Sequence, residues 1–298
     1  MEKKKIIYIT GLGRSGSTIV DIVLGNNPNT VSCGEITNIF QDAYILNQIC
    51  SCGQDGANCE YWQSLKKEWE IKSNLDINKF VKLTTRYEKN TFLAWLRYFF
   101  NYFLFQTKNF KQYLHAMILF MEMLFERNNA DILIDSSKRI LRFQILHSFS
   151  GYEILPIHLV RDLKGVMASE ASDTESIFSK HMKFLKTIIR YIILNLQIHI
   201  ALSRIPHKYL QYEDLLTNPR KEMAAIGILF DLDLSEAICK IDNHREFVLG
   251  HIISGSHIRT KNQIIIMDSP DRKWQKIVPR FYIPCANIIT KYIKKISE

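Results

Sequence analysis

Proline, glycine and long uncharged runs are scarce in this sequence, and each scarcity excludes a class of protein. With 7 Pro and 12 Gly among 298 residues, the chain is neither collagen-like nor of low complexity. The run from Tyr191 to Ser203 lacks Asp, Glu, Lys and Arg. Like every such run here, it is well short of the roughly 18 apolar residues that span a bilayer. We therefore expect a globular chain without a membrane crossing.

The composition is that of a folded protein with an excess of positive charge. Apolar residues make up 47% of the chain and charged residues 23%, enough for one sizeable core. The net charge of +9 attracts anions, which include nucleic acid, acidic lipid and phosphorylated cofactors. The apolar run after the lysines at positions 3 to 5 is too short for a signal-peptide core, so we expect a cytoplasmic protein.

Cysteine is infrequent, and three of the six cysteines are close in sequence. In a cytoplasmic chain we expect thiols rather than bridges. The spacing Cys50-x-Cys52-x6-Cys59 differs from the paired C-x2-C of a zinc finger, although Cys33 or a histidine could complete a site. We expect thiols or one local bridge here, and no metal.

A glycine-rich turn follows the first apolar run. Gly11-Leu-Gly-Arg-Ser-Gly-Ser-Thr18 lies between a predicted strand at residues 5–10 and a predicted helix, the context in which backbone N–H groups bind phosphate. Gly11, Gly16 and Thr18 meet the Walker pattern, but Ser17 stands where its lysine should be. Ordinary ATPase or kinase chemistry needs that lysine and becomes doubtful. A purely structural turn is the alternative.

The remaining pattern alternates short strands with helices. Further strands are predicted near residues 30–33, 131–135, 153–160 and 208–212. We predict an α/β fold, a P-loop-type three-layer sandwich with a mostly parallel central sheet, formed by residues 1–298 as one domain. Residues 36–130 are too long for an ordinary crossover and are predicted to form a large helical insertion. Its apolar stretch, 92–126, is either a subdomain packed on the sheet, a cap that selects the substrate, or a membrane-surface helix.

A second anion site is predicted after the strand at 153–160. Arg161 and Asp162 come just beyond its end, and Ser169 falls in the second turn of the next helix. Ligands of open α/β sheets bind at this carboxyl edge, where a guanidinium and a hydroxyl could hold a phosphate. Asp162 is expected to cap the helix. The alternative is a surface pair of Arg161 and Asp162 before an ordinary helix.

Several motifs taken together resemble one family. They are GLGRSGST at 11–18, Cys33-Gly-Glu35, Asp135-Ser-Ser-Lys138, LVRD with a serine eight places after its arginine, and Tyr212-Glu-Asp-Leu215. From residue 6 to about residue 230 their order and spacing resemble the sulfotransferases that use 3′-phosphoadenosine 5′-phosphosulfate (PAPS). These motifs are most similar to those of the carbohydrate and tyrosylprotein branches of that family.

The resemblance implies the residues that bind the sulfuryl donor. The 5′-phosphosulfate would be held by Arg14, Ser15, Gly16, Ser17 and Thr18. Arg161 and Ser169 would hold the 3′-phosphate, and Arg259, in a looser match over Ser254–Arg259 and Asp271–Trp274, would be a further contact. The segment Tyr212–Leu215 is expected to be structural.

The resemblance also implies the chemistry. Glu35 would be the general base, while Lys138 and Arg14 would stabilise the leaving phosphate. Glu35 could instead merely cap the helix that follows it, and Ser136 and Ser137 could be helix caps. Other branches of the family use histidine, so His251 and His257 are rival bases, although each is expected to be structural.

The expected function is therefore transfer of a sulfuryl group from PAPS to a hydroxyl of a carbohydrate, lipid or other small acceptor. A sulfuryl group carries less charge than a phosphoryl group, which fits the missing Walker lysine and a reaction without metal. We expect no nucleic-acid partner and leave peripheral membrane contact open. One alternative is a kinase-like phosphotransferase, with residues 132–135 as its Walker B strand. The other is a non-catalytic protein that binds nucleotides or a membrane surface.

Overall fold

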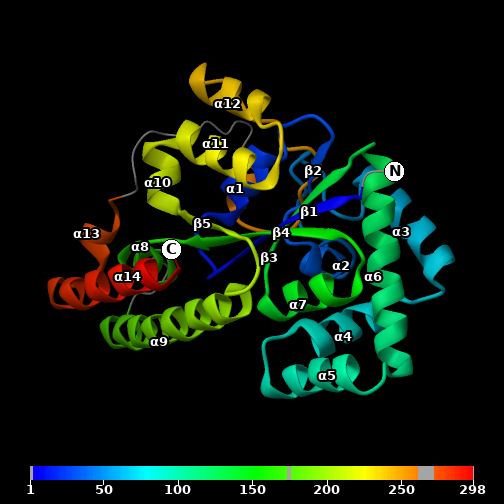
Figure 1. Ribbon diagram of the computed structural model, residues 1–298, viewed down its shortest axis with the longest axis horizontal. Coiled ribbons are helices and arrows are strands. Elements are labelled where there is room, and N and C mark those ends of the chain that lie inside the picture. The colour runs from blue at the N-terminus through cyan, green and yellow to red at the C-terminus, as the bar shows by residue number, and fades with distance from the viewer. Residues whose placement is uncertain (1–2, 173–175, 261–271, 298) are drawn as a thin grey trace. The chain divides into compact units, whose positions relative to one another are not determined.

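A parallel five-stranded sheet forms the centre of the fold. The computed structural model describes residues 3–172, 176–260 and 272–297. The strands are β1 (Lys5–Gly11), β2 (Thr30–Ser32), β3 (Ile132–Lys138), β4 (Glu153–Val160) and β5 (Lys208–Gln211), in the order β2-β3-β1-β4-β5 (Figure 1). The α/β class and the parallel sheet predicted from the sequence are confirmed.

The strand order places the expected ligand site at the ends of β1 and β4. The chain leaves β1 toward β2 on one side of the sheet, and leaves β4 toward β5 on the other side. Such a change of direction between neighbouring parallel strands opens a crevice at their carboxyl ends. The glycine turn follows β1 and Arg161 follows β4, so both predicted anion-binding segments begin there.

The chain divides into two compact units. Unit 1 contains the described residues of 3–9, 18–155 and 246–260, and unit 2 those of 10–17, 156–245 and 272–297. Whether they form the predicted single domain stays a prediction. The helices of unit 1 are α1 (Ser17–Leu24, which begins at the boundary), α2 (Ile36–Tyr44), α3 (Glu60–Ser73), α4 (Ile77–Glu88), α5 (Phe92–Phe103), α6 (Lys108–Arg127), α7 (Ile140–Phe149) and η1 (His257–Thr260). Those of unit 2 are α8 (Leu163–Ala171), α9 (Ile177–Leu202), α10 (Tyr212–Thr217), α11 (Pro219–Phe230), α12 (Ser235–Asp242), α13 (Trp274–Ile277), η2 (Arg280–Tyr282) and α14 (Ile283–Ser297).

In unit 1 the predicted insertion consists of helices α2 to α6. Its core is aromatic: the Phe40 ring lies 4.6 Å from that of Trp69, 4.5 Å from that of Phe80 and 4.6 Å from that of Phe120. Helices α4 and α5 pack against α7 (Figure 1). By contrast, Phe92 and Phe103 at the two ends of α5 are 76% and 70% exposed. The insertion thus has both a buried core and an apolar surface.

In unit 2 a long helix covers an apolar cluster. Phe184 and Tyr191 of α9 are buried in this cluster against residues of α8 and α14. By length and composition alone, the stretch Phe178–Leu202 of α9 could cross a membrane, a criterion that core helices of soluble proteins also meet. The absence of a membrane crossing stays a prediction.

Two strand ends differ from the sequence-based expectation. The strand predicted to end at Asp135 continues to Lys138, because the Ser136 N–H donates to the Gly34 carbonyl at 3.0 Å and extends the pairing. Lys138 then takes a left-handed φ of 65°, which ends the strand. The last strand stops at Gln211, so that Tyr212 begins α10.

Candidate active site

The glycine turn between β1 and α1 has the backbone of an anion cradle. Arg14 and Gly16 have positive φ angles of 68° and 92°, which turn successive peptide groups to one side. The Tyr212 ring packs so closely on Gly16 that a Cβ there would collide with it. Glycine is therefore required at position 16 for two independent reasons, its φ angle and its close neighbour.

A buried hydroxyl in this turn lacks a protein partner. The Ser15 side chain is 1% exposed, and its Oγ makes no hydrogen bond with the part of the chain that the structure describes. A buried hydroxyl without a hydrogen-bond partner lowers the stability of a folded protein by about 1–3 kcal/mol, so such groups are rare and often have a functional role. A phosphate oxygen in the cradle would give this group its acceptor.

Arg161 connects the two predicted anion-binding segments of unit 2. Its Nη1 donates to the carbonyl of Arg14 at 2.9 Å, and its guanidinium lies 4.9 Å from the centre of the Tyr212 ring. A Cβ on Gly165 would lie 2.8 Å from the Arg161 Nε, so the glycine makes room for the arginine. Arg14 and Arg161 are thus on the same side of this unit, as the strand order requires.

Helix α8 begins with the expected cap. The Asp162 carboxylate accepts from the Lys164 N–H at 2.8 Å, and the Asp162 N–H donates to Glu213 Oε1 at 3.1 Å. Asp162 therefore caps α8, and its ion pair is with Lys164 at 3.3 Å rather than with Arg161. Ser169 lies in the second turn of α8, half-buried.

Glu35 and Lys138 form an ion pair in unit 1. The Lys138 ammonium donates to Glu35 Oε1, and the Asn38 amide donates to Glu35 Oε2 at 2.8 Å. Glu35 occupies the N-cap position of α2, but its side chain makes no capping hydrogen bond. The Glu35 carboxylate accepts from Lys138 and Asn38. This argues against the alternative that Glu35 only caps a helix.

The segment after His251 approaches Thr18 and Glu35. The Ser256 N–H donates to Thr18 Oγ1 at 3.3 Å. A Cβ on Gly255, whose φ is +123°, would lie 3.3 Å from Thr18 Oγ1 and 4.0 Å from Glu35 Oε1. Gly255 therefore lets the backbone approach both side chains.

The guanidinium of Arg259 is a buried cation in the same segment. Arg259 is 5% exposed, its Nη1 donates to the Gly255 carbonyl at 2.7 Å, and its Nε makes no hydrogen bond with the described residues. Burial lowers the pKa of Arg259. It also raises the pKa of Asp42, which accepts from Ser254 Oγ at 2.5 Å. A desolvated guanidinium with an unused donor is suited to bind an anion.

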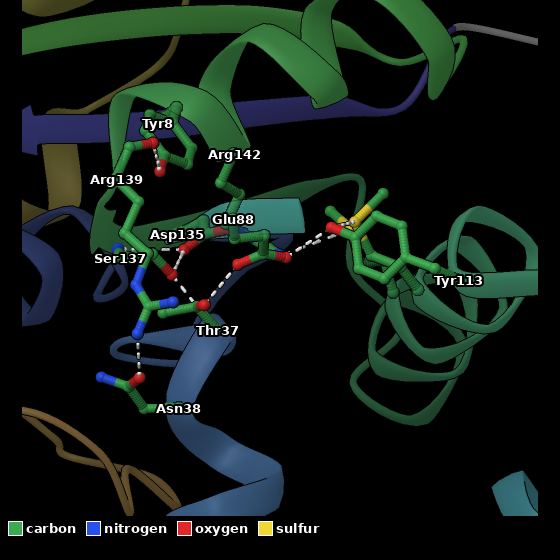
Figure 2. Close-up of polar contacts among 11 residues, drawn as sticks. Tyr8, Thr37, Asn38, Glu88, Tyr113, Asp135, Ser137, Arg139 and Arg142 are labelled. Atoms are coloured by element: carbon green, nitrogen blue, oxygen red, sulfur yellow. Dashed lines mark hydrogen bonds and ion pairs between the residues drawn. The ribbon is translucent and has the colours of Figure 1, made fainter. Parts of the chain in front are cut away.

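A buried polar network in unit 1 joins side chains of α2, α4, β3 and α7 (Figure 2). Arg142 donates to Asp135 Oδ2 at 2.7 Å and to Glu88 Oε1 at 2.6 Å, and none of the three is more than 2% exposed. Thr37, which follows Glu35 by two residues, donates to Glu88 through its hydroxyl and to Ser137 Oγ through its N–H at 3.0 Å. The network therefore ties the start of α2 to the end of β3.

This network removes one alternative for Asp135. Oδ1 accepts from the Ser137 N–H at 3.0 Å and from the Ser137 hydroxyl, while Oδ2 accepts from Arg142. Ser136 donates to Asp21 Oδ2 at 2.6 Å. The hydroxyls of Ser136 and Ser137 thus donate to buried carboxylates and do not cap α7. Asp135 has no carboxylate oxygen without a protein donor, unlike a Walker B aspartate that positions Mg²⁺.

Sequence reasoning missed part of the site. The sequence positions of Glu88, Arg142 and Asp42 gave no indication that these residues belong with Glu35 and Lys138. Tyr212 was expected to be structural, and its contacts with Gly16 and Arg161 are in keeping with that. Of the two rival bases, His257 is exposed in η1, and His251 lies against the cysteine cluster. Asp271 of the looser match lies outside the described residues.

The fold resembles that of two solved sulfotransferase domains. One is the sulfotransferase domain from the olefin synthase of Synechococcus PCC 7002, with 17% identity, a TM-score of 0.54 and coverage of 98% of this chain and 95% of that one. The other is the sulfotransferase domain from the curacin biosynthetic pathway, with 16% identity, a TM-score of 0.56 and coverage of 99% and 98%. No protein-family model and no curated protein matches the sequence. The chain therefore has the sulfotransferase fold.

Proposed function

We propose that this protein is a sulfotransferase that moves the sulfuryl group of PAPS to a hydroxyl. The observation that carries the proposal is the hydrogen bond from Arg161 to the Arg14 carbonyl, 2.9 Å long. It brings together two segments that the family resemblance assigns to opposite ends of one nucleotide, the 5′-phosphosulfate and the 3′-phosphate. A nucleotide with anions at both ends needs two such neighbouring sites, whereas a simple phosphate turn needs one.

Contacts within each unit support the proposed donor-binding roles. In unit 2, the cradle at 14–17 with the unpartnered Ser15 hydroxyl binds the phosphosulfate, while Arg161 and Ser169 bind the 3′-phosphate. In unit 1, Thr18 is a further phosphosulfate contact, and Arg259 is a further phosphate contact with a desolvated guanidinium. These cations and N–H donors supply the charge that a Walker lysine and Mg²⁺ would otherwise provide.

Glu35 and Lys138 carry the transfer step. The bound donor competes for the Lys138 ammonium, which leaves Glu35 and donates to the oxygen that bridges sulfur and phosphorus. Glu35 then takes the proton of the acceptor hydroxyl as its oxygen attacks sulfur. The sulfur–oxygen bond to the phosphate breaks, its electron pair stays on the phosphate, and adenosine 3′,5′-bisphosphate leaves. Arg14 and Lys138 stabilise the charge on that phosphate.

The acceptor is proposed to be a carbohydrate or lipid hydroxyl. Exposed aromatic side chains on α5, such as Phe92 and Phe103, support an apolar or sugar-like acceptor, or contact with a membrane surface. A kinase-like reaction is disfavoured because the carboxylate of Asp135 is committed to Arg142 and Ser137.

Donor binding and turnover test the proposal separately. Calorimetry is expected to show tighter binding of adenosine 3′,5′-bisphosphate than of Mg-ATP, and Arg161→Ala should weaken only the former. Labelled PAPS with a panel of glycans, lipids and phenols should yield a labelled product. Tighter binding of Mg-ATP, with no transfer to any acceptor, would contradict the proposal.

Matched variants test the two catalytic residues. Glu35→Gln should keep bisphosphate affinity and lose about 10²-fold or more in kcat, and Lys138→Ala should lose a similar factor. The exposed pair Glu68–Lys72, joined at 2.7 Å, provides the controls Glu68→Gln and Lys72→Ala. Unchanged turnover in Glu35→Gln would remove Glu35 from the mechanism.

A further inference from the structure

Three cysteines and one histidine of unit 1 converge in a group that the proposed sulfuryl transfer does not use. The ligand atoms of Cys50, Cys52, Cys59 and His251 all lie within 4.8 Å of one another. The sulfurs of Cys52 and Cys59 are 3.7 Å apart, and His251 Nδ1 lies 3.5 Å from the Cys59 sulfur and 3.9 Å from the Cys50 sulfur. Cys33, considered earlier as a fourth member, is not part of this group.

Three separations within this group are those expected in a tetrahedral metal site. A tetrahedron with metal–sulfur bonds of about 2.3 Å and a metal–nitrogen bond of about 2.0–2.1 Å places neighbouring sulfurs about 3.8 Å apart and sulfur about 3.6 Å from nitrogen. Three of the six separations among the ligand atoms, 3.7, 3.5 and 3.9 Å, match these values, and the other three are within 4.8 Å. A disulfide would need a sulfur–sulfur distance of about 2.05 Å, and all six cysteines are free.

The chain around the cysteines is folded into a tight loop. Ile49 and Asp55 form an isolated antiparallel bridge, and the Cys50 N–H donates to the Gln54 carbonyl at 2.8 Å. Gly53 has a φ of +87°, and its N–H donates to the Cys50 carbonyl at 2.9 Å. This turn points the sulfurs of Cys50 and Cys52 the same way from positions only two apart.

The histidine is held against the loop by hydrogen bonds from both sides. The Ser51 N–H donates to the Ile252 carbonyl at 2.9 Å, and the Ile252 N–H donates back to Ser51 Oγ at 2.8 Å. Ser51 Oγ also donates to the Gly250 carbonyl at 2.8 Å. The His251 ring stacks on Tyr61 with 4.5 Å between centroids and 2° between planes. The imidazole is thus oriented before any metal binds.

We propose that Cys50, Cys52, Cys59 and His251 bind one structural zinc ion. Three thiolates and one imidazole form a closed Cys₃His set, which leaves no open position for substrate and is typical of structural zinc. The ion fastens the loop at 50–59 to the segment that begins at His251 and continues to Gly255 and Arg259. This inference is independent of the proposed sulfuryl transfer and differs from the sequence-based expectation of thiols or a local bridge.

Metal analysis of the purified full-length chain is the first test. Protein produced with zinc and passed through gel filtration should carry about one zinc per chain by mass spectrometry. Cys59→Ser and His251→Ala should lower this to near zero, whereas Cys285→Ser, an exposed cysteine outside the group, should leave it unchanged. Absence of zinc, an iron cluster, or equal zinc content in all variants would overturn the proposal.

Cobalt binding and thiol counting can be measured on the wild-type protein, so they test the proposal even if a variant fails to fold. Wild-type protein stripped of metal and given Co²⁺ anaerobically should develop the intense visible bands and sulfur charge-transfer band of tetrahedral cobalt thiolate. His251→Cys should still bind Co²⁺ with a changed spectrum, because four thiolates also suit the site. Octahedral cobalt spectra, or a bridge between Cys52 and Cys59 that removes two of the six free thiols in freshly purified protein, would refute it.

Discussion

The buried carboxyl of Asp21 makes a quantitative prediction about stability and pH. Asp21 lies on α1, is fully buried, and accepts hydrogen bonds from the hydroxyls of Ser32 and Ser136. Burial raises its pKa to about 7, and the negative charge of Asp135 adds to the rise, while the two hydroxyls and Lys138 oppose it. The folded chain therefore keeps this proton to a much higher pH than the unfolded chain.

The sign and size follow from proton linkage. An unfolded Asp has a pKa of about 3.9, so between about pH 4 and pH 7 the folded state binds more protons and stability falls as pH rises. A shift of about 3 pKa units corresponds to about 4 kcal/mol of stability, present at pH 4 and lost by pH 7 and above. Asp21→Asn removes the titration, because the amide stays neutral in both states.

Urea unfolding of wild type and Asp21→Asn from pH 4 to pH 8 measures the effect. The advantage of the variant should grow by about 4 kcal/mol between pH 4 and pH 7 and then remain constant. Any fixed difference in amide hydrogen bonding cancels in this comparison. Asp131→Asn, at an exposed carboxylate of the same unit, should run parallel to wild type. Parallel curves for Asp21→Asn as well would refute the argument.

Three further substitutions test the site. Arg142→Met strands two buried carboxylates and should cost about 3–5 kcal/mol in urea unfolding, whereas the surface ion-pair variant Arg127→Met should cost less than about 1 kcal/mol. Ser15→Ala should leave the stability of the free protein unchanged or raised, and weaken bisphosphate binding by about 1–2 kcal/mol in calorimetry. Gly16→Ala should abolish measurable bisphosphate binding because of its positive φ and the Tyr212 ring. Gly13→Ala, where a Cβ meets nothing within 4 Å, should bind normally.

The edge of the sheet at which the turns after β1 and β4 lie could be predicted from the sequence, because local rules govern it, although the exact ends of β3 and β5 differed. A strand followed by glycines and a helix implies a phosphate turn, and parallel strands present their carboxyl ends at one edge. These rules predicted that Arg14 and Arg161 share one side of the sheet, and they lie together in unit 2. The family resemblance suggested joint roles for Glu35 and Lys138, and these two residues meet as an ion pair in unit 1.

Partners supplied by the helical insertion could not be predicted. Glu88 ends α4, and its contact with Arg142 depends on how four helices pack, which no spacing in the sequence encodes. The same holds for His251, which meets cysteines about 200 positions earlier in the chain through backbone pairing at Ser51. The sequence allowed Cys33 or a histidine beside the three cysteines, but its spacing could not select His251.

The distribution of charge in the two units explains why an anion is the expected ligand. Within unit 1, carboxylates beside the ion pair are neutralised where they stand: Asp21 keeps a proton to about pH 7, and Arg142 serves both Asp135 and Glu88. Glu35 is held by Lys138. The cations contributed by the turns, Arg14, Arg161 and Arg259, instead contact backbone carbonyls or are exposed to solvent. A carbonyl offsets only part of a guanidinium charge, so within each unit these arginines keep positive charge that an anion can help to neutralise.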